Sequence, residues 1–168
     1  MLPAPPAGLP GLRPKLRFLF RWLLRRARLF AGAECGALLI RDRGAVVHYS
    51  GFTPRYWRFP FMGDDDLQIG DTWTAPAHRG RGLALFALET IVAAAARPGR
   101  CFWYVVANTN RPSIRVVEKA GFTLASDGVW IKPWGLKLLG YYVPTAPRPS
   151  MAFSDPEPDG TRGPGSGR

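Results

Sequence analysis

The most informative segment of the chain is a glycine- and arginine-rich stretch between a β-prone run and an Ala/Leu-rich run. It covers residues 74–84 and reads Thr-Ala-Pro-Ala-His-Arg-Gly-Arg-Gly-Leu-Ala. A glycine loop that leads from a strand into a helix leaves several backbone N–H groups unpaired, and the helix dipole favours an anion there. Gly80 and Gly82 let the backbone approach a ligand closely, while Arg79 and Arg81 add positive charge. The segment therefore predicts a site for a phosphate or diphosphate group.

The spacing within this loop excludes two common nucleotide sites. A P-loop has a Lys followed by Ser or Thr after its last glycine, whereas this loop ends in Gly82-Leu83-Ala84. A dinucleotide fingerprint has three glycines in the loop and an acidic residue about 20 residues further on, and this segment has neither feature. The anion is therefore expected to belong to another kind of ligand.

The loop resembles the pyrophosphate loop of the GNAT superfamily, the Gcn5-related N-acetyltransferases. The family pattern is Arg or Gln, two residues, Gly, one residue, and Gly or Ala, and it is met by Arg79, Gly82 and Ala84. A later segment is similar to the family motif Asn-x-x-(Ser/Ala) followed by a helix that ends in Gly-Phe. Asn110 and Ser113 open that segment. The two motifs lie in the family's order, separated by one helix and one strand.

The elements around these motifs are predicted from periodicity and from turn residues. The predicted strands cover residues 36–41, 45–50, 67–74 and 102–107, with a final pair of short strands within 122–132. The predicted helices cover residues 82–96 and 112–120. The first two strands are joined by a glycine-containing hairpin turn, Arg-Asp-Arg-Gly. The resemblance implies one α/β (α+β) domain over residues 31–143, with a mixed central sheet that splays around acetyl-CoA and is flanked by helices.

The resemblance also implies which residues hold acetyl-CoA, the expected co-substrate. Main-chain groups of Trp73, Thr74 and Ala75 would bond the pantetheine arm, and Asn110 and Ser113 would contact its far end. Backbone N–H groups would hold the diphosphate, supplied by His78, Arg79, Gly80, Arg81, Gly82, Leu83 and Ala84. A neutral amine would then attack the thioester carbonyl, with backbone N–H groups stabilising the oxyanion and proximity lowering the barrier. No metal is expected.

A general base is expected, because a protonated amine must lose its proton before it attacks. Side chains alternate along the strand at residues 66–74, and in relatives whose base lies on this strand the active face corresponds to Asp66, Gln68 and Gly70. Asp66 is the expected base, and the alternative is that it belongs to a solvated acidic turn. Asp71 lies on the opposite face and is expected to be structural, although a one-residue slip in register would exchange the two roles.

His48 is a further candidate base on a predicted strand, with a structural histidine as the alternative. Two departures from the family pattern concern the general acid. Val117 stands where many members carry a tyrosine that protonates the thiolate, and Val105 and Val106 stand where some members keep a glutamate. A thiolate can leave without protonation, so these departures do not exclude catalysis.

The N-terminal part of the chain is strongly basic. Residues 1–11 are rich in Pro, Ala and Gly and are expected to be flexible, whereas residues 12–30 predict a basic amphipathic helix without an acidic residue. Each basic residue near anionic headgroups contributes about 1 kcal/mol to membrane binding, so residues 13–30 indicate an anionic membrane surface. The alternative is that the helix packs on the sheet. Nucleic acid is less favoured, because no recognition motif accompanies the net charge of +11.

The cysteines, the apolar runs and the N-terminal residues indicate the cellular compartment. The two cysteines do not make a disulfide framework, and no uncharged apolar run approaches the length of about 18 residues that spans a membrane. Prolines stand where a secretory signal would be basic, so a cytoplasmic protein is expected, with the inner face of the cell membrane as an alternative. Residues 144–168 are rich in Pro, Gly, Ser and Asp and predict a disordered tail.

The resemblance therefore implies an N-acetyltransferase that moves an acetyl group from acetyl-CoA to a primary amine. The runs 59–63 and 66–70, together with Trp73, are similar to acetyltransferase-like proteins of polysaccharide assembly, which would imply an amino sugar as acceptor. Two alternatives stay open. One is a peptide or protein N-acetyltransferase, and the other is a catalytically silent acyl-CoA-binding module docked on a membrane or a partner.

Overall fold

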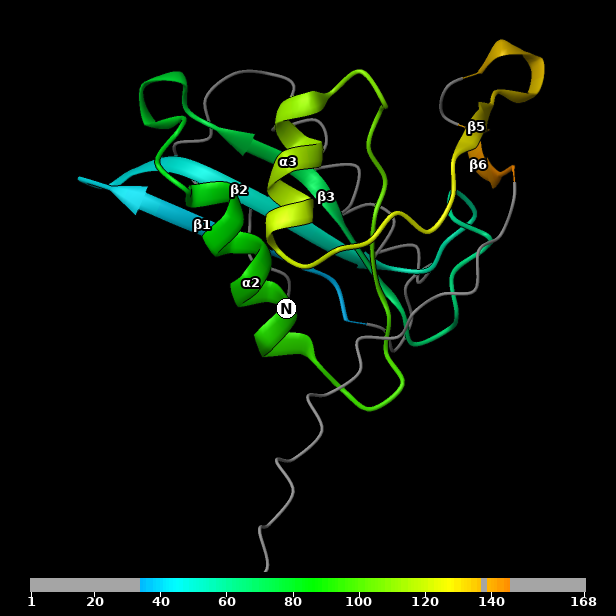
Figure 1. The fold of residues 1–168 in the computed structure, drawn as a ribbon, viewed down its shortest axis with the longest axis horizontal. Helices are drawn as coiled ribbons and strands as arrows, with labels where there is room; N and C mark the ends of the chain where they lie inside the picture. Colours follow the sequence, from blue (N-terminus) through cyan, green and yellow to red (C-terminus); the bar gives the residue numbers. More distant parts are fainter. Residues whose placement is uncertain (1–33, 137–138, 146–168) are drawn as a thin grey trace, which may run out of the picture.

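One mixed β-sheet forms the centre of the protein (Figure 1). The computed structural model describes residues 34–136 and 139–145. Within these residues the sheet has the strand order β1 (Gly36–Asp42), β2 (Ala45–Pro54), β3 (Leu67–Thr74) and β4 (Phe102–Tyr104). The first three strands are antiparallel, while β3 and β4 are parallel. The expected mixed sheet is therefore confirmed. The expectations for residues 1–11 and 12–30 lie outside the described residues.

The sequence predicts a hairpin turn within Arg-Asp-Arg-Gly, and in the structure β1 and β2 are joined there by the two residues Arg43 and Gly44. Arg43 has φ of 47° and Gly44 has φ of 83°. Positive φ at both central residues is the signature of a type I′ turn, whose twist matches that of the flanking strands. Glycine adopts this conformation without strain, so the turn fixes the register of the hairpin.

Two helices cover the same face of the sheet (Figure 1). Helix α2 (Leu83–Ala95) follows the short 3-10 helix η1 (Pro76–His78), and α3 (Arg111–Lys119) follows β4. Ile69 of β3 packs with Leu88 and Ile91 of α2 and with Val117 of α3 in one buried cluster. This cluster is the larger of two buried hydrophobic clusters in the described residues. Because β3 and β4 run parallel, the helices that follow them, α2 and α3, begin at the same end of the sheet.

The end of α3 confirms the predicted glycine stop. Gly121 has φ of 84°, its N–H donates to the Glu118 carbonyl, and the N–H of Phe122 donates to the Val117 carbonyl. These two bonds form a Schellman motif, which satisfies carbonyls that the last helical turn leaves unpaired.

The prediction of two short strands within residues 122–132 is wrong. Only β5 (Gly128–Ile131) lies there, and its antiparallel partner is β6 (Tyr141–Pro144), beyond the 3-10 helix η2 (Pro133–Gly135). The Tyr-Tyr-Val run of β6 has the aromatic and β-branched residues typical of strands, but the sequence analysis did not assign it. Thr145 also donates to the Asp127 carbonyl, so order extends two residues into the expected tail 144–168. Residues 146–168 lie outside the described part of the chain.

Candidate active site

A bulge in β3 distorts the sheet at its centre. Asp71 and Thr72 of β3 together oppose the single residue Ser50 of β2, because the register shifts there. Asp71 has φ of 56°, which is the left-handed conformation of the first residue in a G1-type bulge. A bulge bends its strand and increases the local twist. The second half of β3 is therefore turned away from the line of the first half.

Strand β4 separates from β3 just before this bulge. The two strands pair over three residues only, and the last pair is Ile69 with Tyr104. Since β3 continues to Thr74, its edge beyond Ile69 has no partner strand on this side among the described residues. The expected splay of the sheet is thus present. It also explains why the strand predicted over residues 102–107 ends at Tyr104.

The main-chain groups at the end of β3 alternate between the two sides of the strand. The N–H of Ala75 donates to the Val47 carbonyl at 2.8 Å, so Ala75 faces β2. In an antiparallel pair, the N–H and C=O groups of successive residues point alternately toward the partner strand and away from it. Since those of Ala75 point toward β2, those of Thr74 point to the open edge of β3. The Thr74 carbonyl accepts a hydrogen bond there from Arg79 Nε at 3.3 Å. Among Trp73, Thr74 and Ala75, it is Thr74 whose main chain is best placed for a ligand in the gap.

The glycine loop continues from this edge to the start of α2. The N–H of His78 donates to the Ala75 carbonyl, and that of Arg79 donates to Pro76, so both are used within η1. Gly80 and Gly82 have φ of 75° and 76°, and Gly82 caps α2 in the left-handed conformation.

The first main-chain hydrogen bond of α2 runs from Phe86 N to Gly82 O at 3.0 Å. The N–H groups of Leu83 and Ala84 precede this bond and lie at the N-terminus of the helix, where intrahelical acceptors are lacking. Of the predicted diphosphate donors, residues 80–84 therefore remain, while the side chain of Arg79 can contribute positive charge.

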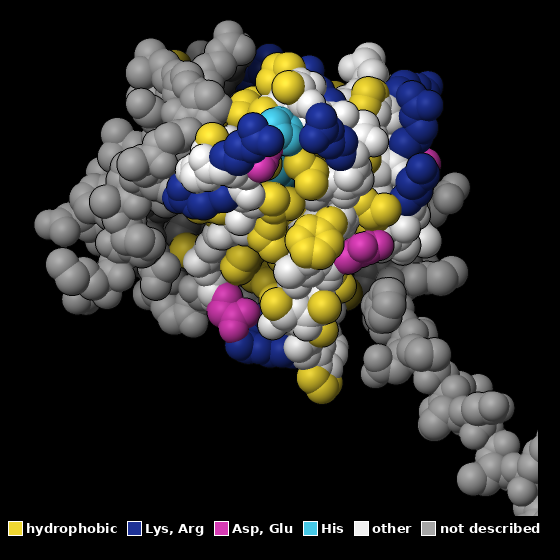
Figure 2. All heavy atoms as spheres, turned by 90° about the vertical axis from the view of Figure 1, so that its left-hand side faces the viewer, with side chains coloured by type: hydrophobic (Ala, Val, Ile, Leu, Met, Phe, Trp, Pro, Cys, Tyr) yellow, Lys and Arg dark blue, Asp and Glu magenta, His cyan; other side chains and the backbone are white. Residues whose placement is uncertain are grey.

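Positive charge surrounds the loop. Arg79 and Arg81 are exposed, and His78 Nε2 lies 3.1 Å from Asp42 Oδ2 at the end of β1. Figure 2 shows basic side chains gathered around a histidine and an acidic side chain on this side of the molecule. The contact between His78 and Asp42 ties the loop to the first hairpin, so the loop is held on a rigid element.

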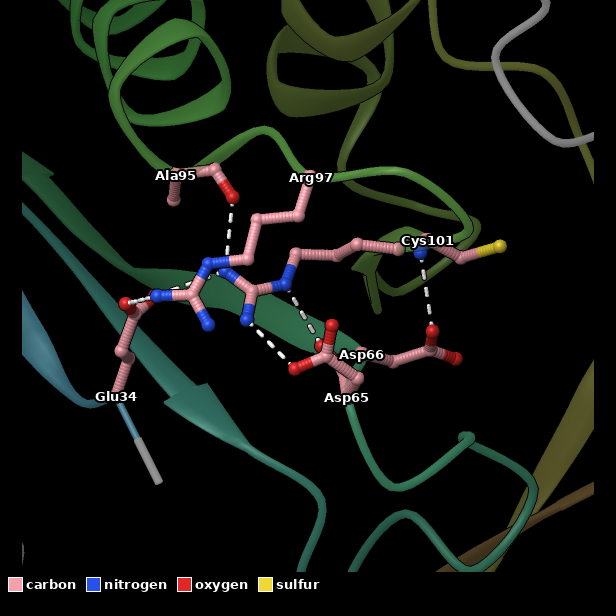
Figure 3. A network of polar contacts seen from close by, with 7 residues as sticks. Glu34, Asp65, Asp66, Ala95, Arg97 and Cys101 are labelled. Atoms are coloured by element: carbon pink, nitrogen blue, oxygen red, sulfur yellow. Dashed lines mark hydrogen bonds and ion pairs between the residues drawn. The ribbon is translucent and has the colours of Figure 1, made fainter. Parts of the chain in front are cut away.

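Asp66, the expected base, is held by three hydrogen bonds. Trp103 Nε1 donates to Oδ2 at 2.7 Å, Gly63 N donates to the same oxygen at 2.8 Å, and Cys101 N donates to Oδ1 at 3.0 Å. The residue is only 8% exposed. Because three donors engage both carboxylate oxygens, the geometry favours a structural role in which Asp66 joins the turn before β3 to the start of β4 (Figure 3).

The other residues of the expected active face are also engaged internally. Gln68 donates from Nε2 to the Ile69 carbonyl at 2.7 Å and folds over Gly70. A Cβ atom on Gly70 would lie 2.4 Å from that Nε2 atom. This part of β3 therefore needs glycine at position 70 for the Gln68 side chain to be accommodated.

His48 lies at the centre of a buried polar network. It is fully buried, with Nδ1 2.8 Å from Thr74 Oγ1 and Nε2 3.0 Å from Ser50 Oγ, and Ser50 Oγ lies 3.1 Å from Thr72 Oγ1. Burial lowers the pKa of His48 to about 4. The ring is therefore neutral at physiological pH and links β2 to the bulged end of β3, which favours the structural alternative for this histidine.

Sequence analysis did not find the partners of His48. His48 and Ser50 are two residues apart on β2, as Thr72 and Thr74 are on β3, so each pair shares a strand face. This polar i, i+2 pattern is the signal that could have found them. Asp71, in contrast, is partly exposed at the bulge, at the point where the gap opens.

Asn110 and Ser113 mark the start of α3. Asn110 Oδ1 accepts a hydrogen bond from Ser113 N at 3.3 Å, so Asn110 is the N-cap of the helix. The N-terminus of α3 lies at the same edge of the sheet as that of α2 (Figure 1). Both motif segments thus border the side on which β3 and β4 separate.

A buried arginine, Arg100, which the sequence analysis missed, binds the C-terminal end of α2. The side chain of Arg100 is 2% exposed. It donates to Asp65 O and Oδ1 at 2.8 and 2.7 Å, and to Glu34 Oε2 and Ala95 O at 2.8 Å each. A cation at a helix C-terminus is favourable, and the Arg-Pro-Gly-Arg turn after α2 is the signal that could have identified it.

The charges in this network shift each other's titration. The hydrogen bond from Arg100 holds the pKa of Asp65 below its usual value. Burial by itself would lower the pKa of Arg100, but its hydrogen bonds to Asp65 and Glu34 outweigh burial and raise it. Arg100 thereby joins the acidic turn before β3 to α2 and to Glu34, two residues before β1, and it stabilises the strands and the helix that border the gap.

Solved structures with a similar fold include several acetyltransferases. An aminoglycoside N-acetyltransferase, AAC(6')-Iy, solved in complex with CoA, matches with a TM-score of 0.53 at 14% identity, over 72% of this chain and 91% of the other. A Bordetella pertussis protein assigned to the GNAT family matches with a TM-score of 0.52 at 27% identity, over 67% of this chain and 68% of the other. A ribosomal-protein-alanine N-acetyltransferase from Brucella melitensis matches with a TM-score of 0.52 at 23% identity, over 68% of this chain and 67% of the other.

The sequence comparisons agree with the fold. A search of curated protein sequences finds no match to this chain. The sequence model of the acetyltransferase (GNAT) family, however, matches residues 8–122, which is more than half of the chain. This match includes the glycine loop, the splayed strands and the start of α3, which the structure brings to one edge of the sheet. The chain therefore belongs to the GNAT family and is an acyltransferase.

Proposed function

We propose that the protein transfers an acetyl group from acetyl-CoA to a primary amine in the gap between β3 and β4. The observation that carries this proposal is the continuity of the site. The edge of β3 that β4 leaves uncovered beyond Ile69 ends at Thr74 and leads directly into the loop whose N–H groups lie at the start of α2. An extended pantetheine arm fits such an edge, and a diphosphate fits such a helix terminus. The CoA complex of the aminoglycoside acetyltransferase relative supports the same ligand class.

The reaction needs little from the protein besides positioning. The amine nitrogen attacks the thioester carbonyl, the C–N bond forms, the C–S bond breaks, and CoA leaves as a thiolate. Main-chain N–H groups beside the gap stabilise the oxyanion. The proton released by the amine goes to a general base or to water.

We assign the base to Asp71 in preference to Asp66 and His48. Asp71 is partly exposed where the gap opens, whereas Asp66 is only 8% exposed and His48 is fully buried. An Asp71→Asn variant should retain the left-handed backbone, since Asn also tolerates positive φ. It should lower kcat, because the variant lacks the carboxylate that accepts the proton of the amine. Asp66→Asn should instead lower the midpoint of thermal unfolding.

An amino sugar is the acceptor that we favour. The loop between β2 and β3 supplies edge-to-face aromatic contacts near the start of β4, including Tyr56 with Phe59 at 5.2 Å and Phe61 with Trp103 at 5.0 Å. Aromatic side chains are suited to packing against a flat apolar ring face. The relative that acts on aminoglycosides is consistent with this class, while the ribosomal-protein acetyltransferase favours a peptide amine as the second candidate.

A panel of amines tests the proposal directly. Release of the CoA thiol should exceed background with amino sugars, and a peptide amine should give no more than a small fraction of that rate. Preference for the peptide would move the assignment to a peptide N-acetyltransferase. Binding of acetyl-CoA without turnover of any amine would leave the catalytically silent acyl-CoA-binding module, and Asp71→Asn would then change nothing.

A further inference from the structure

The small second sheet carries most of the exposed apolar side chains in the described residues. Seven of the ten large hydrophobic residues that are exposed lie on or beside β5, η2 and β6, namely Val129, Trp130, Ile131, Trp134, Leu136, Leu139 and Val143. Trp134 is 88% exposed, more than any other residue of this group, whereas Phe86 on α2 is 58% exposed. Monomeric proteins rarely expose apolar groups in such a concentration without a binding role.

The exposed tryptophan is held outward by a defined turn. Trp134 has φ of 49° and Gly135 has φ of 73°. Gly135 N donates to the Lys132 carbonyl and Leu136 N donates to Pro133, each at 3.0 Å. A non-glycine residue with positive φ is uncommon, so the turn holds Trp134 in an unusual backbone conformation. The tip of the hairpin is thus a hydrogen-bonded turn that presents an indole ring to solvent.

The base of the hairpin is anchored to the main domain. Tyr142 N donates to the Arg58 carbonyl at 2.9 Å, the Arg58 guanidinium lies 5.4 Å from the centre of the Trp130 ring, and Phe61 contacts Tyr142 at 5.6 Å. Figure 1 shows β5 and β6 at the far end of the molecule from α2. A hairpin with a fixed base and a projecting apolar tip is suited to inserting a few side chains into a lipid bilayer.

Charge identifies the kind of surface. Residues 128–145 contain two lysines and no acidic residue, and the whole chain carries a net charge of +11. A second copy of the chain would bring the same positive charge to such a contact. An anionic bilayer is instead complementary, because Trp and Leu favour the interfacial region while Lys binds the headgroups. No helix within the described ranges combines the length and the hydrophobicity needed to span a bilayer.

We propose that the β5–β6 hairpin inserts its tip, centred on Trp134 and Leu136, into the interfacial region of an anionic lipid bilayer. This docking surface goes beyond the acetyl transfer proposed above and does not depend on which amine is the acceptor. It is also distinct from the basic segment 13–30, which would add charge attraction independently.

Vesicle flotation with the full chain tests the proposal. The vesicles contain phosphatidylglycerol with phosphatidylcholine, or phosphatidylcholine alone. The double variant Trp134→Asn/Leu136→Asn should bind the anionic vesicles at least about tenfold more weakly than the wild type, since each of its two substitutions removes an apolar side chain from the interface. The matched control Phe86→Asn also replaces an exposed apolar residue and should bind like the wild type.

A second readout locates the contact. In vesicles with brominated acyl chains, Trp134→Phe should retain binding but lose part of the tryptophan quenching seen in the wild type. Equal flotation of the wild type and the double variant would overturn the proposal and assign binding to another segment. Absence of flotation of the wild type would overturn it as well. So would a dimer in sedimentation velocity that the double variant dissociates, because a second copy would then be the occupant.

Discussion

Burial of His48 should make the domain lose stability as the pH falls below about 6.5, the usual pKa of an exposed histidine. The side chain is fully buried, both ring nitrogens have hydroxyl partners, and burial lowers the pKa to about 4. Between these two values the unfolded chain binds a proton that the folded chain does not bind. Acidification therefore favours the unfolded state, and the free energy of unfolding rises with pH across this window.

The magnitude follows from the two pKa values. Each pKa unit corresponds to about 1.4 kcal/mol, so the full shift is worth about 3 kcal/mol once the pH reaches the folded-state value. Between about pH 7.5 and about pH 5 the expected loss from this one group is about 2 kcal/mol. Such a loss is a large part of the stability of a typical domain.

Urea denaturation over this pH range measures the effect. His48→Gln retains a donor and an acceptor for Ser50 and Thr74 but does not titrate. The free-energy difference between wild type and His48→Gln should therefore shrink by about 2 kcal/mol as the pH falls from about 7.5 to about 5.

Two results would refute this reasoning. One is an NMR titration in which the His48 ring protonates near its unperturbed pKa. The other is a parallel loss of stability in the wild type and in His48→Gln across the whole pH range. Either would mean that the network around His48 admits the charged form.

The Arg100 network and the two aspartates give further predictions. Arg100→Met should lower the free energy of unfolding by about 2–4 kcal/mol, because it removes the buried member of a charged hydrogen-bond network, whereas the exposed Arg97→Met should cost less than about 1 kcal/mol. Arg100 lowers the pKa of Asp65, so the ion pair between them stabilises the folded state above about pH 4, the ordinary pKa of an aspartate, and this stabilisation is lost as the pH falls further. The stability of Arg100→Met should therefore depend less on pH below about pH 4 than that of the wild type. Asp66→Asn should cost about 1–3 kcal/mol in urea denaturation while Asp71→Asn costs less than about 1 kcal/mol, and an equal cost would remove the distinction between them.

Local sequence signals predicted much of the fold. The type I′ turn at Gly44, the helix stop at Gly121 and the loop between β3 and α2 each depend on one conformational preference of glycine, which is visible in the sequence. The helices and the first strands followed from periodicity over the adjacent residues. These features are local, and so they could be predicted without knowledge of the contacts.

The candidate site was harder to predict, because its geometry depends on a bulge and on partners distant in the chain. The alternation argument for the strand at 66–74 assumes an unbroken period of two, and the bulge at Asp71 shifts the faces of all later residues. The donors to Asp66 include residues 101 and 103, which no spacing rule connects to position 66. Hydrogen-bond saturation of a carboxylate is a tertiary property, so the sequence could name Asp66 but not decide its role.

Acetyl-CoA binding by two matched glycine variants tests the central claim most directly. Gly82 and Gly99 have φ of 76° and 78°, and a Cβ atom on either would meet no atom within 4 Å. Alanine at each should therefore cost a similar strain of about 1–2 kcal/mol, but only Gly82 lies in the loop that we expect to hold the diphosphate.

Isothermal titration of acetyl-CoA should show at least about tenfold weaker binding to Gly82→Ala, since misaligning one N–H donor to a charged group is enough for this loss. Binding to Gly99→Ala should equal that of the wild type. Wild-type affinity in Gly82→Ala, or an equal loss in both variants, would contradict the assignment of the loop as the coenzyme site.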